Sequence, residues 1–175
     1  MMIAITGTPG TGKTAVANCL REKGEDVIDL HHYIEENGLK GSLDKKRDTY
    51  NVDAEELNTS IKEYVRGKKV MAEGHLSHFL DCDMIIVIRC RPSVLYERLK
   101  ERGYTEKKIM ENVQAEALDV ILCESTERNA HVFEIDNTSC TAEQTALMIK
   151  EIISGRSSGH EPGSVDWSAE MEKWC

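Results

Sequence analysis

The segment Met2-Ile3-Ala4-Ile5-Thr6-Gly7-Thr8-Pro9-Gly10-Thr11-Gly12-Lys13-Thr14 decides the fold of this 175-residue chain. Its first five residues form an apolar run, and residues 7–14 match the pattern G-x-x-x-x-G-K-[ST] at every position. Glycines let the backbone wrap a phosphate chain, and successive N–H groups with a helix N-terminus offer donors to the anion. The pattern predicts a strand, a phosphate-binding loop (P-loop) and a helix.

The polar residues of this loop predict its ligand. The Lys13 amine would reach the β- and γ-phosphates of a purine nucleoside triphosphate. The Thr14 hydroxyl would ligate Mg²⁺, which keeps several waters and takes few protein oxygens. The expected cofactors are therefore ATP and Mg²⁺.

The rest of the chain alternates short runs rich in Ile and Val with longer stretches of helical period. This alternation predicts an α/β protein with the three-layer P-loop NTPase fold, a five-stranded parallel sheet flanked by helices. The run Met84–Arg89 is apolar on both faces, as expected for a central strand. The expected strands are Met2–Thr6, Asp26–Asp29, Lys69–Glu73, Met84–Arg89 and His131–Asp136. The expected helices are Lys13–Lys23, Asp53–Val65, Ser93–Arg102, Glu106–Glu124 and Thr141–Ile153.

The composition is that of a globular protein, with 40% apolar and 30% charged residues. No apolar run approaches the roughly 18 residues of a membrane span, and a signal-peptide pattern is lacking, so we expect a cytoplasmic protein that does not bind a membrane. The six cysteines lack the close spacing of zinc or redox motifs, which favours reduced thiols.

The net charge of −9 hides an uneven distribution. Residues 89–108 hold seven basic and three acidic side chains, a balance of +4, which leaves 15 basic against 28 acidic elsewhere, or −13. An acidic surface repels nucleic acid, so we expect no direct non-specific nucleic-acid binding and a locally bound anion.

Residues 154–164 are rich in Ser and Gly and indicate a flexible linker. The tail that follows has Trp167, Met171 and Trp174 on one face of an expected terminal helix. Packing of this helix on its own domain or a symmetry mate is the favoured interpretation, and docking of a partner is the alternative. The predicted organisation is a domain over 1–153 and a linker with tail over 154–175.

Further candidate residues lie at the end of one strand and in the basic segment. Glu73 ends the third expected strand, where it would hold or activate a metal-bound water, and His75 would orient water or contact a phosphate. Phosphoryl transfer requires cations near the equatorial oxygens, and Arg102, just before Gly103, is a candidate on a mobile lid. Arg98 lies one helical turn earlier on the same face.

The motif alone does not separate kinases, GTPases and motor-like ATPases. The chain has no N-K-x-D-type guanine reader, and large ATPase machines need far more residues. Small kinases are therefore the leading class.

The chain resembles the adenylate kinase isoenzyme six family, small P-loop nucleoside monophosphate (NMP) kinases of archaea and eukaryotes that are also implicated in ribosome assembly. The resemblance covers roughly Met1 to Ile153. It rests on Gly7–Thr14, on Glu73-Gly74-His75, and on Val94-Leu95-Tyr96-Glu97-Arg98-Leu99 continuing through Arg102-Gly103-Tyr104 and Glu106-Lys107-Lys108 to Asn112-Val113-Gln114.

The resemblance implies roles for individual positions. Residues 101–111 would form a short lid with Arg102 on ATP, and residues 30–53 would bind the monophosphate. Glu73 and His75 would correspond to a Walker B-type acid and a histidine linked to ATPase activity. The ATP phosphates would be bound by Gly10, Gly12, Lys13, Thr14 and Ala15.

Two positions depart from the family pattern. Glu73 stands where members often have Asp, and His32-Tyr33-Ile34-Glu35 stands where members have an arginine in the first acceptor helix. Arg47 is the substitute candidate for the monophosphate, with Arg98 as a second candidate. The loop Asp136-Asn137-Thr138 resembles the stretch that borders adenine in related kinases.

Three functional hypotheses follow. The first is an NMP kinase of adenylate kinase type that transfers the ATP γ-phosphate to AMP or a related NMP, with Lys13, Mg²⁺ and Arg102 neutralising charge. The second is an ATP-driven assembly factor acting in small ribosomal subunit maturation, whose acidic surface would suit a basic platform ribosomal protein. The third is a P-loop kinase of another small acceptor, such as a sugar acid or dephospho-coenzyme A.

Overall fold

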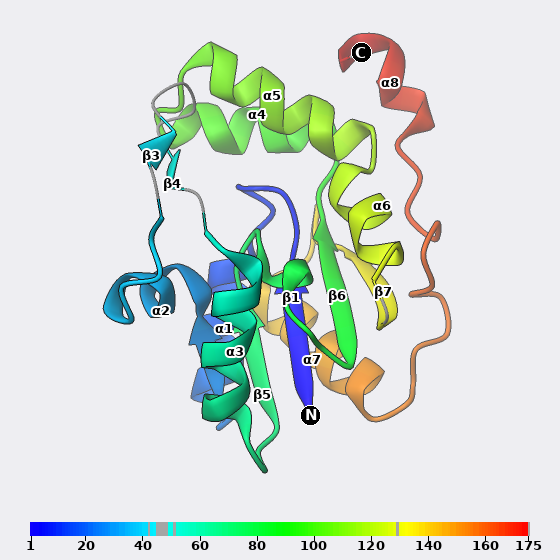
Figure 1. Ribbon diagram of the computed structural model, residues 1–175. Coiled ribbons are helices and arrows are strands. Elements are labelled where there is room, and N and C mark those ends of the chain that lie inside the picture. Colours follow the sequence, from blue (N-terminus) through cyan, green and yellow to red (C-terminus); the bar gives the residue numbers. More distant parts are fainter. Residues whose placement is uncertain (42, 45–48, 51, 129, 175) are drawn as a thin grey trace.

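The computed structural model describes residues 1–41, 43, 44, 49, 50, 52–128 and 130–174. Its centre is a five-stranded parallel sheet with the strand order β2-β5-β1-β6-β7 (Figure 1). The predicted fold class, a parallel sheet between helical layers, is confirmed. The strands are β1 (Met2–Thr6), β2 (Val27–Asp29), β5 (Val70–Glu73), β6 (Met84–Arg89) and β7 (His131–Asp136).

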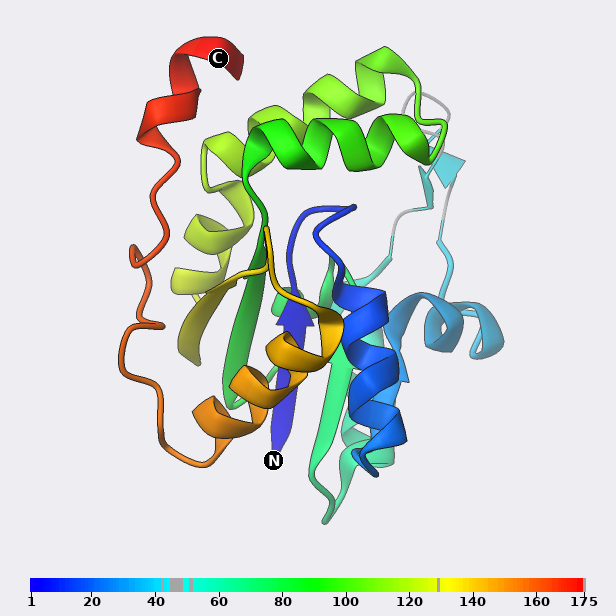
Figure 2. The same cartoon turned by 180° about the vertical axis from the view of Figure 1, so that it is seen from behind.

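Helices cover both faces of this sheet. Helices α1 (Lys13–Glu22) and α7 (Ala142–Ile153) lie on one face, and α3 (Ala54–Val65) and α6 (Val120–Thr126) lie on the other (Figures 1 and 2). Successive side chains of β1 point to opposite faces of the sheet. Ile3 and Ile5 pack with α1 and α7, whereas Met2 and Ala4 face the other side. Because β1 is buried on both faces, its sequence is apolar without alternating polar residues.

The remaining elements lie at the carboxyl edge of the sheet and along its side. Helices α4 (Pro92–Glu101) and α5 (Glu106–Ala117) lie across this edge, above the loop that follows β1 (Figure 2). Helix α2 (Leu30–Glu36), the hairpin β3 (Leu43–Asp44) and β4 (Thr49–Tyr50), the short 3₁₀ helix Ser77–Phe79 and the terminal helix α8 (Ser168–Trp174) complete the described chain.

Two predictions about helices are corrected by the structure. The helix expected over Glu106–Glu124 is two helices, because Asp119 adopts the left-handed conformation (φ 56°) between α5 and α6. A left-handed residue ends the backbone ladder, and the side chain of Asp119 is bound there to Arg89. Helix α2 begins at Leu30 after Asp29, whose carboxylate accepts the His32 N–H. The family resemblance implied a helix at residues 32–35, but the list expected from periodicity did not include it.

The basic segment 89–108 divides into a buried and an exposed part. Arg89 is 1% exposed and forms ion pairs with Glu116 of α5 (2.8 Å), Glu134 of β7 (2.8 Å) and Asp119. Arg89 therefore adds no positive charge to the surface, although it counts toward the +4 balance of the segment. Burial in a parallel strand explains the difference, since an arginine there must be paired.

The C-terminal segment packs on its own domain. The Glu134 N–H donates to the His160 carbonyl (2.8 Å), and the Val165 N–H donates to the Glu134 side chain (3.0 Å), so residues 160–165 run along the open edge of β7. The composition indicated a flexible linker, whereas these residues are hydrogen-bonded to β7. They cover the edge of the sheet, where backbone groups would otherwise be unpaired.

Both tryptophans of the tail are buried, which agrees with the favoured interpretation of own-domain packing. Trp174 stacks on Tyr96 of α4 with ring centroids 5.3 Å apart. Trp167 precedes α8 rather than lying on it, and Met171 is 39% exposed, so the expected three-residue apolar face is not one helix face.

Two sequence expectations about the chain as a whole can be compared with the described residues. Five of the cysteines, Cys19, Cys82, Cys90, Cys123 and Cys140, are free there. In the same residues we find no helix whose length and apolar character would let it cross a membrane.

Replacement of Arg89 by Met is expected to lower the free energy of unfolding by about 3–5 kcal/mol, because Glu116 and Glu134 would remain buried without their cation. Urea unfolding followed by circular dichroism measures this loss. The matched control is Arg91→Met, whose side chain is 54% exposed and whose loss is expected within about 0.5 kcal/mol. Equal effects of the two substitutions would contradict a structural role for the buried network.

Candidate active site

The candidate site lies where two central strands end. Strand β1 leads into the P-loop and α1, while its neighbour β5 ends at Glu73. On either side of β1 the connections turn in opposite directions, which is where ligands bind in open α/β sheets. The sheet therefore brings Glu73 to the loop although the two are about 60 positions apart in sequence.

Close packing around the P-loop requires glycine at two of the predicted positions. Gly12 has φ +104°, and a Cβ placed there would lie 2.5 Å from the Asn137 Nδ2 atom. Gly10 has φ +95°, and its Cβ would lie 2.8 Å from Leu95 and 2.9 Å from Leu99 of α4. The loop is thus held tightly between the sheet and α4.

Lys13 is buried and points its amine back into the loop. The Nζ atom donates to the carbonyl oxygens of Gly7 (2.7 Å) and Thr8 (3.0 Å). Burial lowers the pKa of this amine to about 8, while the charges of Glu73 and Glu116 act in the opposite direction and that of Arg102 acts with burial. Burial of the amine therefore outweighs the attraction of the two nearby carboxylates for its proton.

Thr14 and Glu73, the two predicted metal-site residues, lie next to each other in the structure. The Thr14 hydroxyl donates to Glu73 Oε1 (3.3 Å), and Thr14 and Ala15 are exposed at the start of α1. Burial raises the pKa of Glu73, and nearby Asp29 adds to the increase.

These ligands fit Mg²⁺, which prefers oxygen donors and keeps several waters. A nearby cation would also offset the cost of burying the Glu73 carboxylate. Among the described residues, no group of three or more His, Cys, Asp or Glu side chains could hold a metal ion on its own. Phosphate oxygens and water would have to supply the remaining ligands.

His75 follows Glu73 on the loop after β5 and is exposed. Partial desolvation by the surrounding chain and the charges of Lys13, His78 and His31 lower its pKa. His78, by contrast, is 1% exposed and lies between the Thr6 hydroxyl (2.9 Å) and the Glu124 carboxylate (3.0 Å). His78 is therefore held by structural partners, and His75 is the histidine open to a ligand.

Arg102, predicted to lie on the lid, and Arg98, one helical turn before it, are in different environments. Arg102 is exposed at the C-terminal end of α4, and its charge acts on Lys13 across the site. Arg98 lies inward and donates to the carbonyls of Thr138 (2.8 Å), Asn137 (3.2 Å) and Thr11 (3.5 Å). Its observed partners are backbone groups of the P-loop and the loop after β7, and its role toward a monophosphate stays a prediction.

Asn137 is a P-loop contact that the sequence interpretation missed. It is 4% exposed, donates from Nδ2 to the Thr11 carbonyl (2.7 Å) and accepts at Oδ1 from the Thr145 hydroxyl (2.5 Å). The family resemblance suggested that the loop Asp136-Asn137-Thr138 borders adenine. The structure shows in addition that the Asn137 side chain holds the P-loop. Asn137 lies in the loop that leads to α7 and belongs to no recognised sequence motif. Only the fold therefore reveals its contact with the P-loop.

The remaining predicted monophosphate ligand, Arg47, lies outside the described residues. In α2, His32 pairs with Glu36 (3.1 Å), a helix-surface contact between exposed side chains. Helix α2 and the described parts of the β3–β4 hairpin, which belong to the region predicted to bind the monophosphate, lie to one side of the sheet (Figure 1).

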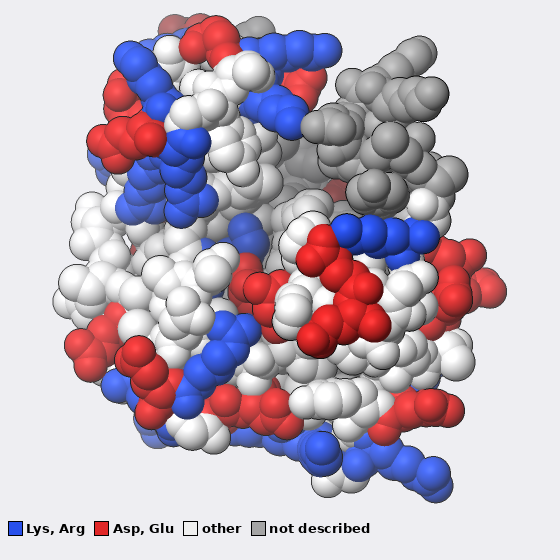
Figure 3. Space-filling model, turned by 90° about the vertical axis from the view of Figure 1, so that its left-hand side faces the viewer, with Lys and Arg blue, Asp and Glu red and all other residues white. Residues whose placement is uncertain are grey.

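Basic side chains gather above the site. Figure 3 shows lysine and arginine side chains near the top of the molecule, at the height of α4 and α5 in Figure 1. The exposed members of the basic segment at this end are Lys100, Arg102, Lys107 and Lys108. Exposed Glu97, Glu101 and Glu106 lie between them in the sequence, and local binding of an anion at this end stays a prediction.

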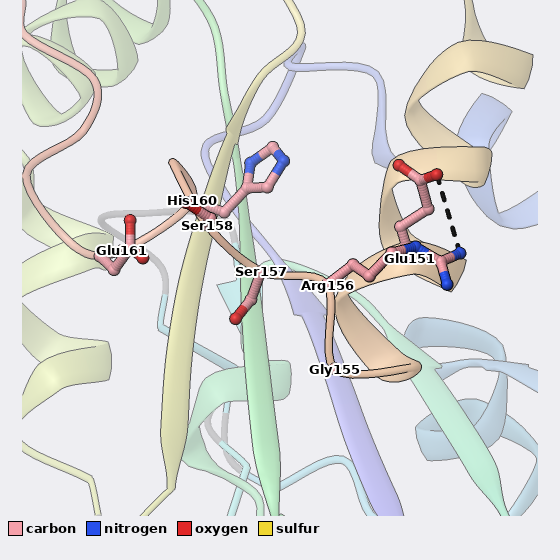
Figure 4. A pocket seen from close by; sticks show the side chains of 7 residues that line it. All are labelled: Glu151, Gly155, Arg156, Ser157, Ser158, His160 and Glu161. Carbon is pink, nitrogen blue, oxygen red and sulfur yellow. Dashed lines mark ion pairs between the residues drawn. The ribbon is translucent and has the colours of Figure 1, made fainter.

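A separate surface hollow lies at the other end of α7 (Figure 4). Glu151, Arg156 and His160 contribute to its lining, and Arg156 is paired with Glu151 (3.8 Å). The N-terminal end of α7 is the end tied to the P-loop through Asn137, so this hollow is remote from the site. We assign it no ligand.

Solved structures with the same fold are kinases. Shikimate kinase from Acinetobacter baumannii in complex with shikimate matches with a TM-score of 0.62 at 19% identity, over 90% of this chain and 94% of that one. Deoxyadenosine kinase from M. mycoides matches with a TM-score of 0.54 at 14% identity, over 89% and 100%. With the P-loop geometry, the fold places the chain in the class of P-loop kinase folds.

Sequence relatives identify the family. A family model described as an AAA domain matches residues 3–119. Proteins named "Putative adenylate kinase" match over nearly their whole length, at 44% identity in Thermococcus kodakarensis and 43% in Methanocaldococcus jannaschii, each over 96% of this chain and 93% of the relative. The chain belongs to this adenylate kinase family.

Substitution of Gly12 by Ala is expected to destabilise the protein more than the same change at Gly24. Both glycines have positive φ, which costs about 1 kcal/mol for alanine, but the Cβ at Gly12 also meets Asn137 whereas nothing lies within 4 Å at Gly24. We expect a further loss of about 1–3 kcal/mol at Gly12. Thermal and urea unfolding of both variants check this, and equal losses would show that the P-loop is not tightly packed.

Proposed function

We propose that this protein is a nucleoside monophosphate kinase of adenylate kinase type, which transfers the γ-phosphate of Mg²⁺·ATP to AMP or a related monophosphate. One observation carries the proposal. Lys13, Thr14 and Glu73 converge at the carboxyl edge of the sheet beneath an arginine-bearing helix corner, in a chain of the adenylate kinase family. These groups are the cations and oxygen ligands that phosphoryl transfer requires.

Each group has a role in the proposed transfer. The Lys13 amine, held by two loop carbonyls, would bind β- and γ-phosphate oxygens, and the backbone N–H groups from Gly10 to Ala15 would bind the phosphate chain. Thr14 and, through a water, Glu73 would hold Mg²⁺, which supplies positive charge to the reacting phosphates. Arg102 of the proposed lid, residues 101–111, would neutralise charge that develops in the transition state. Positioning and charge then suffice, without an essential general base.

The acceptor would bind over residues 30–53. Arg47 remains the proposed contact for the monophosphate, and Arg98 is the second, positioned one turn before Arg102. AMP is the preferred assignment because the relatives that match over the whole chain carry the adenylate kinase name.

ATP hydrolysis is proposed as a side reaction. The observation that favours it is the exposed His75 beside Glu73, whose pKa is raised by burial, since such a pair is suited to orient water near a phosphate. The role in small ribosomal subunit maturation, with a basic platform ribosomal protein as partner, stays a prediction from the family resemblance. It uses the acidic surface outside residues 89–108.

The variant Lys13→Ala is expected to lose AMP-dependent formation of ADP from ATP by at least about a hundredfold, because a phosphate-binding cation in a dry site is lost. ADP production is measured with and without AMP, and hydrolysis is measured in the absence of AMP. Lys23→Ala is the control, since this lysine follows the same helix and pairs at the surface with Glu143. If the unmodified protein forms no ADP from AMP, or if Lys13→Ala keeps full activity, the proposed kinase function is wrong.

Binding of ATP is expected to depend on pH through Lys13. Its pKa of about 8 in the empty site means that the amine is charged at pH 7 but largely neutral at pH 9. The bound phosphates raise that pKa, so binding at pH 9 takes up a proton and the Kd rises by about tenfold per pH unit above the free pKa.

Titration calorimetry in two buffers of different ionisation enthalpy measures this proton uptake. We expect an increase from near zero at pH 7 toward one proton at pH 9 in the unmodified protein and in Lys23→Ala. A constant uptake across this range would contradict a lowered Lys13 pKa.

A further inference from the structure

A buried glutamate joins the P-loop to elements that take no direct part in phosphate binding. Glu116 lies in the last turn of α5 and is 2% exposed. Its Oε2 atom accepts from the Thr8 hydroxyl of the P-loop (2.5 Å). Its Oε1 atom accepts from Arg89 Nε (2.8 Å), from the Cys90 N–H (3.1 Å) and from the Trp167 indole N–H (3.3 Å). Each oxygen of one carboxylate thus serves a different part of the molecule.

The P-loop end of this connection leads to the phosphate-binding lysine. Thr8 is 1% exposed, and its carbonyl accepts from Lys13 Nζ (3.0 Å), from the Thr11 N–H (3.2 Å) and from the Thr11 hydroxyl (3.0 Å). The hydroxyl of the same residue is fixed by Glu116. The Glu116 carboxylate therefore helps to fix the residue that supplies one of the two carbonyls accepting from Lys13.

The other end of the connection leads to the C-terminal segment. Trp167 is 7% exposed, and its ring lies 5.9 Å from the Arg89 guanidinium. The Val165 N–H (3.0 Å) and the Ser164 hydroxyl (3.4 Å) donate to Glu134 Oε1, while Glu134 Oε2 accepts from Arg89 Nη1 (2.8 Å). The segment thus contacts two of the three acids that pair with Arg89, Glu116 and Glu134.

We propose that Glu116 is a positioning residue of the nucleotide site and that residues 164–167 of the C-terminal segment are part of its support. The Trp167 indole and Arg89 hold the carboxylate of Glu116, which orients Thr8 and through it Lys13. This inference rests on the proposed binding of ATP at the P-loop. It assigns to the tail a function that differs from docking of a partner.

A role confined to stability would make a different prediction. A buried ion network can be replaced by apolar groups without loss of a specific function, and its removal then lowers only the free energy of unfolding. Loss of a positioning contact instead weakens ATP binding specifically, because the P-loop amine is displaced while the acceptor region is untouched. The two roles separate when affinities for ATP and AMP are compared.

The experiment uses the full chain and four variants. Thr8→Val removes the hydroxyl that Glu116 binds and keeps the branched shape, and Trp167→Phe removes the indole N–H that binds Glu116. The matched control is Trp174→Phe, which removes an indole N–H of the same tail that donates to Glu170 instead (3.2 Å). The double variant Thr8→Val/Trp167→Phe tests whether the two contacts belong to one connection.

We expect Thr8→Val to raise the Kd for Mg²⁺·ATP by about five- to tenfold, the worth of one buried hydrogen bond, and to leave the KM for AMP within about twofold. Trp167→Phe is expected to raise the Kd by about threefold alone and to add nothing in the Thr8→Val background, whereas Trp174→Phe leaves it unchanged. Thermal unfolding identifies any variant that does not fold, and such a variant is replaced by Glu116→Gln, for which the same weakening of ATP binding is expected.

The inference is overturned if Thr8→Val binds ATP as the unmodified protein does, or if the effects of Trp167→Phe and Thr8→Val multiply independently. Equal effects of Trp167→Phe and Trp174→Phe would likewise assign the tail a role in stability alone. Failure of the proposed function has another signature, since the unmodified protein would then bind no ATP or transfer no phosphate to AMP.

Discussion

The rest of the structure depends on how the charge of Arg89 is balanced inside the protein. This arginine ends a strand buried on both faces, where an unpaired guanidinium would carry a large desolvation cost. The acids that pair with it come from different elements, Glu116 from α5, Asp119 from the turn before α6, and Glu134 from β7. Satisfaction of one cation therefore fixes the end of α5, the break between two helices and the position of the adjacent strand.

The same network shapes the site because it lies directly behind the P-loop. Glu116 contacts Arg89 through one oxygen and Thr8 through the other, while Asn137 and Arg98 hold the Thr11 carbonyl from the opposite side. The loop is thus fixed at two points before any ligand binds, which reduces the cost of ordering it around phosphates. Lys13 is buried in this loop, and within the described part of the chain its amine donates to backbone carbonyls rather than to a carboxylate. Exposed basic side chains lie above it (Figure 3).

Most of the fold could be predicted from local sequence, including the strand, the glycine-rich loop and the helix that carries Lys13 and Thr14. The strand bounds Met2–Thr6, Met84–Arg89 and His131–Asp136 agree with the structure, since β-branched runs between turn residues carry a strong local signal. The break at Asp119 in the expected helix over Glu106–Glu124 was not predicted, because the partner of Asp119, Arg89, is distant in sequence. For the same reason Arg89 was counted with exposed charges, and Asn137 and Glu116 were missed. Asn137 contacts Thr11, 126 residues away, and Glu116 contacts Cys90, 26 residues away, and Thr8, 108 residues away.

The sequence by itself determined that the chain has a strand, a loop with the phosphate-binding sequence pattern and a helix, and that Lys13 and Thr14 lie at the end of this pattern. These features depend on glycine conformations and residue types within a few neighbouring positions. Only the tertiary structure decided that Glu73 reaches Thr14, that Glu116 supports the loop from behind, and that a segment of linker-like composition covers the edge of β7. These contacts arise from strand order and the pairing of buried charges, and no local pattern encodes either.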